Sequence, residues 1–169
     1  MARLPSISHA MEDYLKAIYE LSSQAPSSRV STSQLAEHMS CTPASVTNML
    51  QKLSSLLLVR YVPYRGVTLT EAGERIALEV LRHHRLIELY LAEILGYSWD
   101  QVHDEADQLE HVISEEFEDR IDAALGYPAR DPHGAPIPTK DGQIPGSSEI
   151  SLWEAANGCL LYTSDAADE

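Results

Sequence analysis

The stretch that decides the fold runs from Ser31 to Leu53 and reads STSQLAEHMSCTPASVTNMLQKL. It opens with a capping box, in which Ser31 caps a helix and Gln34, three residues later, reaches back to the cap amide. The short helix that follows has an apolar side made of Leu35, Ala36 and Met39. Ser40 and Cys41 then form a turn. This part of the stretch predicts a short capped helix with one buried side.

A second capped helix follows at once. Thr42 caps it, and Pro43 suits its first position, where no N–H partner is needed. Apolar residues recur at spacings of three and four, which predicts an inward face of Val46, Met49, Leu50 and Leu53. The outward face consists of Thr42, Ala44, Ser45, Thr47, Asn48, Gln51 and Lys52. A short helix, a tight turn and a capped helix with a polar outer face indicate a helix-turn-helix.

The flanking segments complete a winged helix. Helical spacing of apolar residues predicts a preceding helix over residues 11–22. After the helix-turn-helix, the β-prone runs 58–62 and 67–69 flank a turn that contains glycine. This hairpin is the predicted wing, with Arg65 at its tip. Thr70 is expected to cap the next helix.

The predicted helix-turn-helix carries side chains suited to DNA. Asn48 and Gln51 can each present a donor and an acceptor to adenine in the major groove. The methyl groups of Ala44 and Thr47 can contact the thymine methyl. Phosphate contacts are expected from three basic residues, Lys52, Arg60 and Arg65. Taken singly, each residue also fits an ordinary exposed side chain, and a winged helix can serve as a protein-interaction module alone.

The net charge of −14 is unevenly distributed. Residues 1–75 carry 7 Lys and Arg against 6 Asp and Glu, residues 76–145 carry 5 against 15, and residues 146–169 carry 0 against 5. A near-neutral first half can present Lys and Arg to phosphate. The acidic second half fits either a solvated acidic surface or a metal-binding domain.

Length and composition also bear on the number of domains and on where in the cell the protein is found. The chain has 169 residues, of which 44% are hydrophobic and 22% charged, and this suits one domain or two small ones. No apolar run approaches the roughly 20 residues of a membrane span, and the first residues do not resemble a signal peptide. Cys41 and Cys159 do not suggest a disulfide framework. A cytoplasmic protein with no membrane partner is expected.

The acidic half contains residues of the kind that bind transition metals. A long amphipathic helix is predicted over residues 71–95, and His84 and Glu88 lie one turn apart on it. A second helix is predicted over 99–125, with one stripe of potential ligands made of His103, Asp107, Glu110 and His111. Imidazoles and carboxylates on one face suit Mn²⁺, Fe²⁺ or Zn²⁺. Surface ion pairs fit the same spacing, and His83 is expected at the surface.

Several of these segments resemble the diphtheria toxin repressor (DtxR/MntR) family of iron- and manganese-dependent transcriptional regulators. The similarity covers about residues 8–158. Its most specific segments are 11–15 (MEDYL), 84–88 (HRLIE), 102–107 (VHDEAD), 109–111 (LEH) and 131–138 (DPHGAPIP). The resemblance implies a mainly α protein, with a winged helix-turn-helix followed by an all-helical dimerisation and metal-binding domain. It implies a primary metal site of Asp13, Asp107, Glu110 and His111, and an ancillary site of His84, Glu88 and His103.

Two positions bear on the metal. The iron sensors of that family have Met at the position of Asp13 and Cys at that of Asp107, whereas its manganese sensors have carboxylates there. Hard oxygen ligands favour Mn²⁺ over softer metals, so Mn²⁺ is the expected cofactor, with Fe²⁺ or Zn²⁺ as alternatives. One class of manganese sensor has Glu where this chain has Lys16, so its two-metal arrangement is not expected here. No organic cofactor is expected.

The same resemblance suggests how the chain is organised. Residues 1–75 would form the DNA-binding domain, and residues 76–140 the dimerisation and metal-binding domain. Residues 141–158 would be a linker and the first strand of an SH3-like barrel, which supplies further ancillary ligands in the family. Residues 159–169 are expected to be a non-native tail. His133 is expected to be a structural residue of a loop.

The predicted function is a metal-dependent repressor of metal-homeostasis genes, acting as a homodimer on palindromic operator DNA. The hypothesis is that the carboxylates repel one another without metal. A cation then ties the first helix to the second domain and fixes the spacing of the two recognition helices. Two other classes stay open: a metallohydrolase that uses the His/Asp/Glu stripe, and a winged-helix regulator that senses an organic ligand. An enzyme is not expected, since no nucleophile motif or Gly-rich phosphate loop is present.

Overall fold

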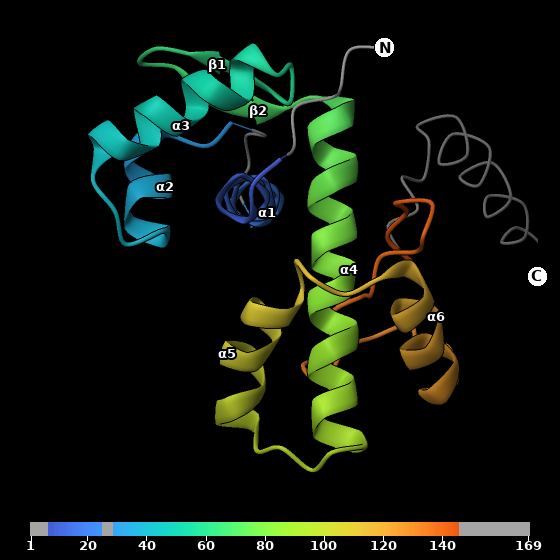
Figure 1. Cartoon of the computed structure of the whole chain (residues 1–169). Coiled ribbons are helices and arrows are strands. Elements are labelled where there is room, and N and C mark those ends of the chain that lie inside the picture. The colour runs from blue at the N-terminus through green and yellow to red at the C-terminus, as the bar shows by residue number, and fades with distance from the viewer. Residues whose placement is uncertain (1–6, 25–28, 146–169) are drawn as a thin grey trace, which may run out of the picture.

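One long helix, α4 (Glu71–Glu93), links the two halves of the molecule and contributes to the core of each (Figure 1). The computed structural model describes residues 7–24 and 29–145. The N-terminal half consists of α1 (His9–Gln24), α2 (Thr32–His38), α3 (Pro43–Ser55), β1 (Val59–Val62) and β2 (Gly66–Leu69). The C-terminal half adds α5 (Trp99–Leu109), α6 (Glu115–Ala124) and a loop. In the described ranges, none of the helices is long and apolar enough to cross a membrane.

The predicted helix-turn-helix is confirmed. The amide of Gln34 donates to Ser31 Oγ at 3.2 Å, and the amide of Ser31 donates to Gln34 Oε1 at 2.9 Å, so the capping box has formed. Thr42 Oγ1 accepts from the amide of Ser45 at 3.2 Å, and Pro43 opens α3. Both helices bury the sides that the spacing predicted, with Leu35, Val46, Leu50 and Leu53 fully buried.

The wing is also confirmed. It is an antiparallel pair of β1 and β2, with Val59 opposite Leu69. Gly66 has a φ of +96°, and a Cβ there would lie 2.5 Å from the carbonyl oxygen of Val30, so the end of the turn requires glycine. Arg65 is exposed next to it, as the sequence predicted.

The start of α4 packs tightly against the N-terminal half. Thr70 caps the helix, since its hydroxyl accepts from the amide of Gly73 at 3.2 Å and donates to the carbonyl oxygen of Leu58 at 2.9 Å. Gly73 passes so close to the wing that a Cβ there would lie 2.0 Å from that same oxygen. Ala77, one turn further, is fully buried in the N-terminal core. These contacts fix α4 to the DNA-binding half.

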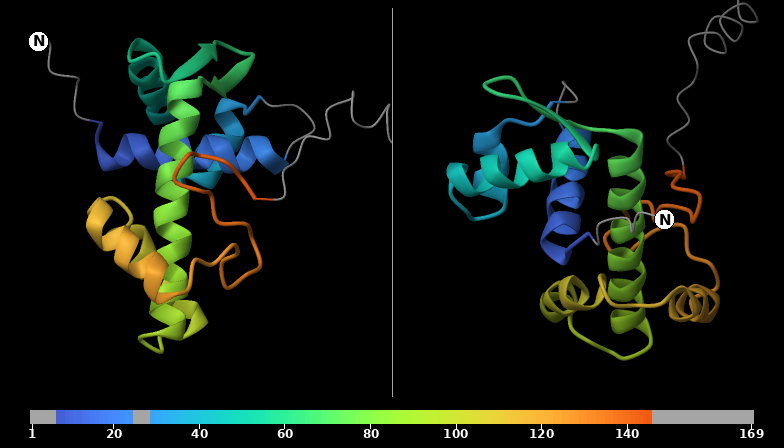
Figure 2. Two further views of the ribbon diagram at one scale, coloured as in Figure 1. Left: turned by 90° about the vertical axis from the view of Figure 1, so that its right-hand side faces the viewer. Right: turned by 45° about the horizontal axis from the view of Figure 1, so that its top comes forward.

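In the C-terminal half, α5 and α6 lie on opposite sides of α4 (Figures 1 and 2). Their shared core consists of Leu86, Ile87, Leu89, Leu91, Val102, Ala106, Ile121 and Ile137. Two arginines of α4 hold the loop that follows α6. Arg82 donates to the carbonyl oxygen of Pro138 at 2.8 Å and pairs with Glu118, and Arg85 donates to the carbonyl oxygen of Pro136.

Two predictions for the C-terminal half are wrong. The single helix predicted over 99–125 is two helices. The chain leaves α5 at Glu110, and Ser114 caps α6 by accepting from the amide of Phe117 at 3.3 Å. His83, expected at the surface, is buried, because its face of α4 meets the turn between the two helices.

Other boundaries differ less. α1 extends beyond the predicted 11–22 at both ends. α4 crosses the predicted domain boundary at residue 75, so the division into residues 1–75 and 76–140 stays a prediction. The predicted barrel strand and the predicted tail, 159–169, lie outside the described residues.

Replacing Gly73 with Ala should destabilise the protein. The added methyl group overlaps the carbonyl oxygen of Leu58, so the wing or the start of α4 must move, at a cost of about 1–3 kcal/mol or more. Urea unfolding followed by circular dichroism measures this. The control is Ala72→Ser at the exposed neighbouring position, where a change within about 0.5 kcal/mol is expected. Native-like stability of Gly73→Ala would contradict the close approach.

Candidate metal centre

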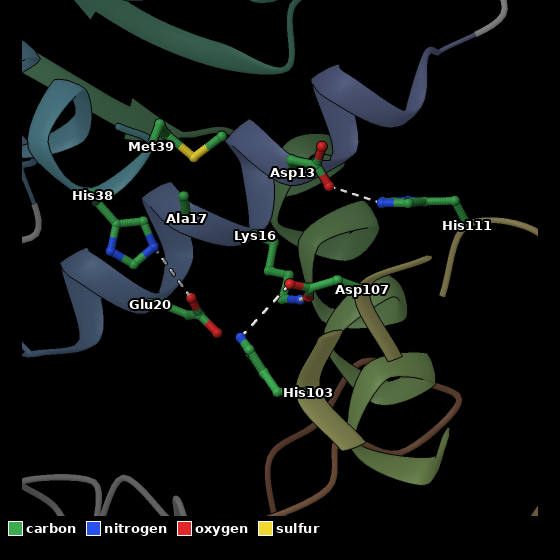
Figure 3. A pocket seen from close by; sticks show the side chains of 9 residues that line it. All are labelled: Asp13, Lys16, Ala17, Glu20, His38, Met39, His103, Asp107 and His111. Atoms are coloured by element: carbon green, nitrogen blue, oxygen red, sulfur yellow. Dashed lines mark hydrogen bonds and ion pairs between the residues drawn. The ribbon is translucent and has the colours of Figure 1, made fainter. Parts of the chain in front are cut away.

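α1 crosses α4 between the rest of the DNA-binding half and α5 (Figure 2). Tyr14, Leu15 and Ile18 are buried on one side of α1, and this orients Asp13 and Lys16 towards the C-terminal half. Figure 3 shows Asp13 pointing to His111 and Lys16 pointing to Asp107. These four side chains help to line a cleft of about 510 Å³ between the two halves.

His111 lies between two carboxylates of α1. Its Nε2 is 2.8 Å from Asp13 Oδ1, and its Nδ1 is 2.6 Å from Glu12 Oε2. The ring also stacks on His9, with centroids 4.8 Å apart. Glu110 Oε1 is 3.4 Å from Nε2. Nε2 of His111 therefore faces both Asp13 and Glu110, whereas Nδ1 faces Glu12.

Glu110 lies at the centre of a second set of contacts. Its side chain is 1% exposed, and Oε2 lies 2.5 Å from His84 Nδ1 and 2.7 Å from Lys16 Nζ. Asp107 Oδ1 lies 3.2 Å from both of those nitrogen atoms. The main chain is held as well, since Glu110 O lies 3.0 Å from His83 Nδ1. Three elements of the fold thus converge on one buried carboxylate.

A third set joins α4 to the solvent side of α5. Glu88 Oε1 lies 3.1 Å from His84 Nε2 and 3.2 Å from His103 Nδ1, and the two nitrogen atoms are 3.1 Å apart. His84 and Glu88 are buried, but the side chain of His103 is 63% exposed. This set is open to the solvent on one side.

Within the described residues, three groups of side chains have ligand atoms within 4.8 Å of one another. They are Asp13, Glu110 and His111; His84, Asp107 and Glu110; and His84, Glu88 and His103. All the donors are carboxylate oxygens or imidazole nitrogens, which suit Mn²⁺, Fe²⁺ or Zn²⁺. The residues present therefore fit a divalent transition metal.

The hydrogen bonds between the imidazole of His84 and its carboxylate neighbours determine which of these side chains are charged. Burial favours the neutral ring of His84, but hydrogen bonds with Asp107, Glu110 and Glu88 outweigh burial and raise its pKa to about 10. The hydrogen bond with His84 holds the pKa of Asp107 well below its usual range. Burial raises the pKa of Glu88, but bonds with His84 and His103 lower it overall. His84 is thus a cation among carboxylates at neutral pH.

The structure brings the predicted ligands together in a different grouping. The expected ancillary residues His84, Glu88 and His103 form one group, and Asp13 joins Glu110 and His111. Asp107, expected beside them, instead joins His84 and Glu110. The four-residue stripe is not continuous, because Glu110 and His111 lie beyond the last residue of α5.

The predicted DNA-contacting residues lie together on the opposite half. On α3 and its cap, Thr42, Ala44, Ser45, Asn48, Gln51 and Lys52 are exposed, and Thr47 is partly exposed. Thr47, Gln51 and Arg65 line a groove of about 550 Å³ between α3 and the wing.

Sequence analysis missed two contacts at the metal centre. It gave Glu12 no role and treated Lys16 only as a departure from a family pattern. Lys16 lies three residues after Asp13 on α1, so helical spacing is the signal that could have found it. Glu12 directly precedes Asp13, and helical spacing does not place adjacent residues on one face. His83 was missed because its partner, the main chain of Glu110, leaves no mark in the sequence.

Two protein-family models match the chain. The N-terminal DNA-binding domain of the iron-dependent repressors matches residues 6–67. The metal-binding and dimerisation domain of the same repressors matches residues 70–139, so together they cover most of the chain. The chain belongs to the iron-dependent repressor family. That family consists of metal-dependent transcriptional repressors rather than enzymes, and the expected mainly α fold class is confirmed.

Named relatives agree with this family. An HTH-type transcriptional regulator of Methanocaldococcus jannaschii is 39% identical over 115 residues, which are 68% of this chain and 91% of that protein. The iron-dependent repressor IdeR of Mycobacterium tuberculosis is 33% identical over 145 residues, 83% of this chain and 62% of that protein. The regulator MntR of Oceanobacillus iheyensis is 36% identical over 118 residues, 70% of this chain and 78% of that protein.

Solved structures resemble the fold closely. A manganese-dependent transcriptional repressor in complex with manganese matches with a TM-score of 0.74 and 46% identity. The match covers 80% of this chain and 61% of that one. The manganese regulator SloR matches with a TM-score of 0.70 and 42% identity, over 79% of this chain and 61% of that one. The chain spans about three fifths of the length of these proteins.

His84 should make the stability of the protein fall at alkaline pH in the presence of a chelator. Its pKa is raised from 6.5 to about 10 in the folded protein, so the charged ring stabilises the fold fully below pH 6.5. This contribution is lost as the pH rises through 10. Urea unfolding of the native protein and of His84→Gln, across this range of pH, measures the difference between them. That difference should shrink as the pH rises; a constant difference would contradict the assignment.

Proposed function

We propose that this chain is a Mn²⁺-dependent repressor that binds a palindromic operator as a homodimer. The observation that supports this most strongly is the contact between Asp13 on α1 and His111 beyond α5, with Glu110 beside them. These potential ligands lie where the DNA-binding half meets the C-terminal helices. A cation there would act on the relation between the two halves, which is what a metal-controlled repressor requires.

The proposed ligands follow from the three groups. Asp13, Glu110 and His111 would hold the regulatory ion with Asp107 close by, and His84, Glu88 and His103 would hold the ancillary one. When bound, a divalent cation supplies two positive charges to this carboxylate-rich junction. One solved relative is described with manganese and another, ScaR, with Zn²⁺. The choice of Mn²⁺ therefore rests on the oxygen-rich ligands of this chain, none of which is sulfur.

Glu12 is proposed as a positioning residue. Its Oε2 lies 2.6 Å from Nδ1 of His111, so the other ring nitrogen, Nε2, faces Asp13 and Glu110. A carboxylate on the far nitrogen of a ligating imidazole fixes the orientation and the tautomer of the ring. The pair of consecutive acidic residues on α1 therefore divides into one ligand and one support.

The hypothesis that carboxylate repulsion loosens the two halves without metal stays a prediction. Two observations bear on how large a movement a cation would control. Lys16 and His84 lie among the carboxylates, and α4 packs into both cores. The proposed control is therefore a small adjustment of α1 rather than the joining of separate domains.

α1 also contacts the helix-turn-helix directly, so a movement of α1 can change the position of the helix-turn-helix. The hydroxyl of Tyr14, next to Asp13, lies 3.3 Å from Cys41 Sγ in the turn between α2 and α3. Tyr14 is buried, so a shift of α1 at Asp13 must displace this turn or strain the core. The position of the recognition helix α3 is thereby linked to the ligands on α1.

The proposed DNA surface is the outer side of α3 together with the wing. The start of α3 carries Thr42, whose hydroxyl lies 3.0 Å from that of Ser45, and this end suits a phosphate. Asn48 and Gln51 would read base edges, with Lys52 and Arg65 on the phosphates.

Dimerisation is proposed through the C-terminal half. Large apolar side chains are exposed there, at Ile94, Leu95, Leu109, Val112 and Phe117. The family model that matches residues 70–139 describes a metal-binding and dimerisation domain, so a partner copy is expected to cover part of this half. A second copy of the chain would supply the second recognition helix, and two-fold symmetry would then match a palindromic operator.

The Asp13→Asn change should weaken the response to Mn²⁺. It removes the charge of one proposed ligand and keeps the size of the side chain, so we expect at least a ~10-fold loss of Mn²⁺ affinity. Operator binding measured by fluorescence anisotropy during a Mn²⁺ titration reports it. The control is Glu20→Gln, on the same helix and lining the same cleft but outside the three ligand groups. An undiminished response of Asp13→Asn would refute the proposed site.

Two changes on α3 should separate affinity from specificity. Lys52→Ala removes a proposed phosphate contact, so it should weaken all DNA binding alike and reduce the slope of log K against log salt by about 1. Gln51→Ala should instead cost about 1–3 kcal/mol on the operator and relax the preference at one base pair. Anisotropy with operator variants and a salt series measures both. Arg120→Ala, exposed on α6, is the control, and loss of binding there would argue against this surface.

A further inference from the structure

Tyr64, in the turn of the wing, has the most exposed large apolar side chain in the described part of the chain. Its relative exposure is 106%, so no neighbouring group covers the ring. Packing within the fold therefore does not explain why an aromatic residue stands at this position.

The backbone at Tyr64 also disfavours this type of residue. Tyr64 is the third residue of the turn Val62–Arg65, which closes when the amide of Arg65 donates to the carbonyl oxygen of Val62 at 3.0 Å. Its φ is +64°, in the left-handed region. Gly and Asn are usual at such a turn position, whereas a bulky side chain adopts this conformation under strain. A residue that the fold neither packs nor favours points to a role in binding.

The turn of the wing forms one wall of the groove between α3 and the wing. Thr47 and Gln51 of α3 line the facing wall, and Pro63, Tyr64 and Arg65 line the wall on the wing. The residues that line this groove include several hydroxyl groups and one guanidinium group, and none of them is a carboxylate. A groove with such a lining suits a sugar–phosphate backbone of DNA.

A DNA backbone in this groove determines what Tyr64 would meet. One sugar–phosphate backbone separates the major groove of a duplex from the neighbouring minor groove. With α3 in the major groove and that backbone between α3 and the wing, the turn of the wing lies over the minor groove. The minor groove of B-DNA is about 6 Å wide, which admits a single aromatic side chain.

We propose that Tyr64 places its ring in this minor groove and makes the protein prefer A·T over G·C pairs there. This inference rests on the proposed operator-binding function. Guanine projects its N2 amino group into the minor groove, whereas an A·T pair has no such group. A ring packed against the floor of the groove collides with that amino group. Tyr64 thus adds a second point of sequence recognition to the bases that face α3.

The ring of Tyr64, rather than its hydroxyl group, is the part that would read the DNA. A hydroxyl group bonded to a phosphate would carry no preference between base pairs. Tyr64→Phe keeps the ring and removes the hydroxyl group, so it should keep both the affinity and the preference. Tyr64→Asn removes the ring and suits the left-handed backbone, so it should lose the preference while the wing stays folded.

Operator duplexes with single changes of base pair test the proposal. Fluorescence anisotropy with Mn²⁺ measures how tightly the full chain binds each duplex. Every pair beside those that face α3 is made A·T, G·C or inosine·C in turn. Inosine·C presents the major-groove groups of G·C but lacks the minor-groove amino group, so it isolates the minor groove. At one or more of these pairs, the native chain should bind G·C about 10-fold more weakly than A·T, and inosine·C like A·T.

The two variants at position 64 give opposite expectations. Tyr64→Asn should bind the three kinds of duplex alike, with affinity for the A·T duplex reduced by about 10-fold. Tyr64→Phe should behave like the native chain. Retained preference in Tyr64→Asn, or its loss in Tyr64→Phe, would contradict a contact made by the ring.

Stability separates binding from folding. Because the ring packs against nothing and Asn suits a positive φ, neither variant should lower the urea concentration at the midpoint of unfolding. A lower midpoint would mean that Tyr64 supports the wing itself, and the inference would fail.

Tyr127→Asn is the matched control. Tyr127 also has a positive φ, +58°, and is 72% exposed, but it follows α6 in the C-terminal half. Its replacement should change neither the affinity nor the preference between base pairs. A loss equal to that of Tyr64→Asn would mean that removing any exposed tyrosine weakens binding, and would overturn the inference.

The outcomes distinguish this inference from the proposed function. If the native chain with Mn²⁺ binds none of the duplexes, the proposed function fails. If it binds them but does not distinguish A·T from G·C at any pair beside those that face α3, only the role of Tyr64 fails.

Discussion

The burial of one carboxylate, that of Glu110, is the constraint on which the junction depends. A carboxylate that is 1% exposed is tolerated only where charged partners and hydrogen bonds surround it. Lys16 comes from α1, His84 from α4, and His111 follows directly in the chain. Because these partners belong to different elements, pairing a single side chain fixes α1, α4 and the end of α5 against one another.

This constraint explains why α1 has a double role. One side of the helix completes the N-terminal core, and the other presents Glu12, Asp13 and Lys16 to the C-terminal half. A helix that is packed on both sides cannot move freely. A small shift of its acidic and basic contacts must therefore also shift the side chains that it packs into the N-terminal core. The contact between Tyr14 and Cys41 lies on that path to the recognition helix.

The N-terminal half was predictable because its signals are local. The box of Ser31 and Gln34, the cap at Thr42 and the glycine at the end of the wing turn each depend on residues only a few positions apart. The C-terminal half was predictable only in part. A periodic stripe assumes that the helix continues, but α5 ends at Leu109, and the cap at Ser114 restarts the chain in another direction.

The metal centre shows why residue types alone do not define a site. Resemblance named seven potential ligands, but it could not show that Asp107 groups with His84 instead of Asp13. Nor could it show that a lysine about ninety positions away in the chain lies among them, since only the crossing of α1 and α4 brings Lys16 to Glu110. Where adjacent groups share His84 and Glu110, a change at one position alters the charge felt at the next. The affinity of one group for an ion therefore depends on its neighbours, and cannot be assigned one ligand at a time.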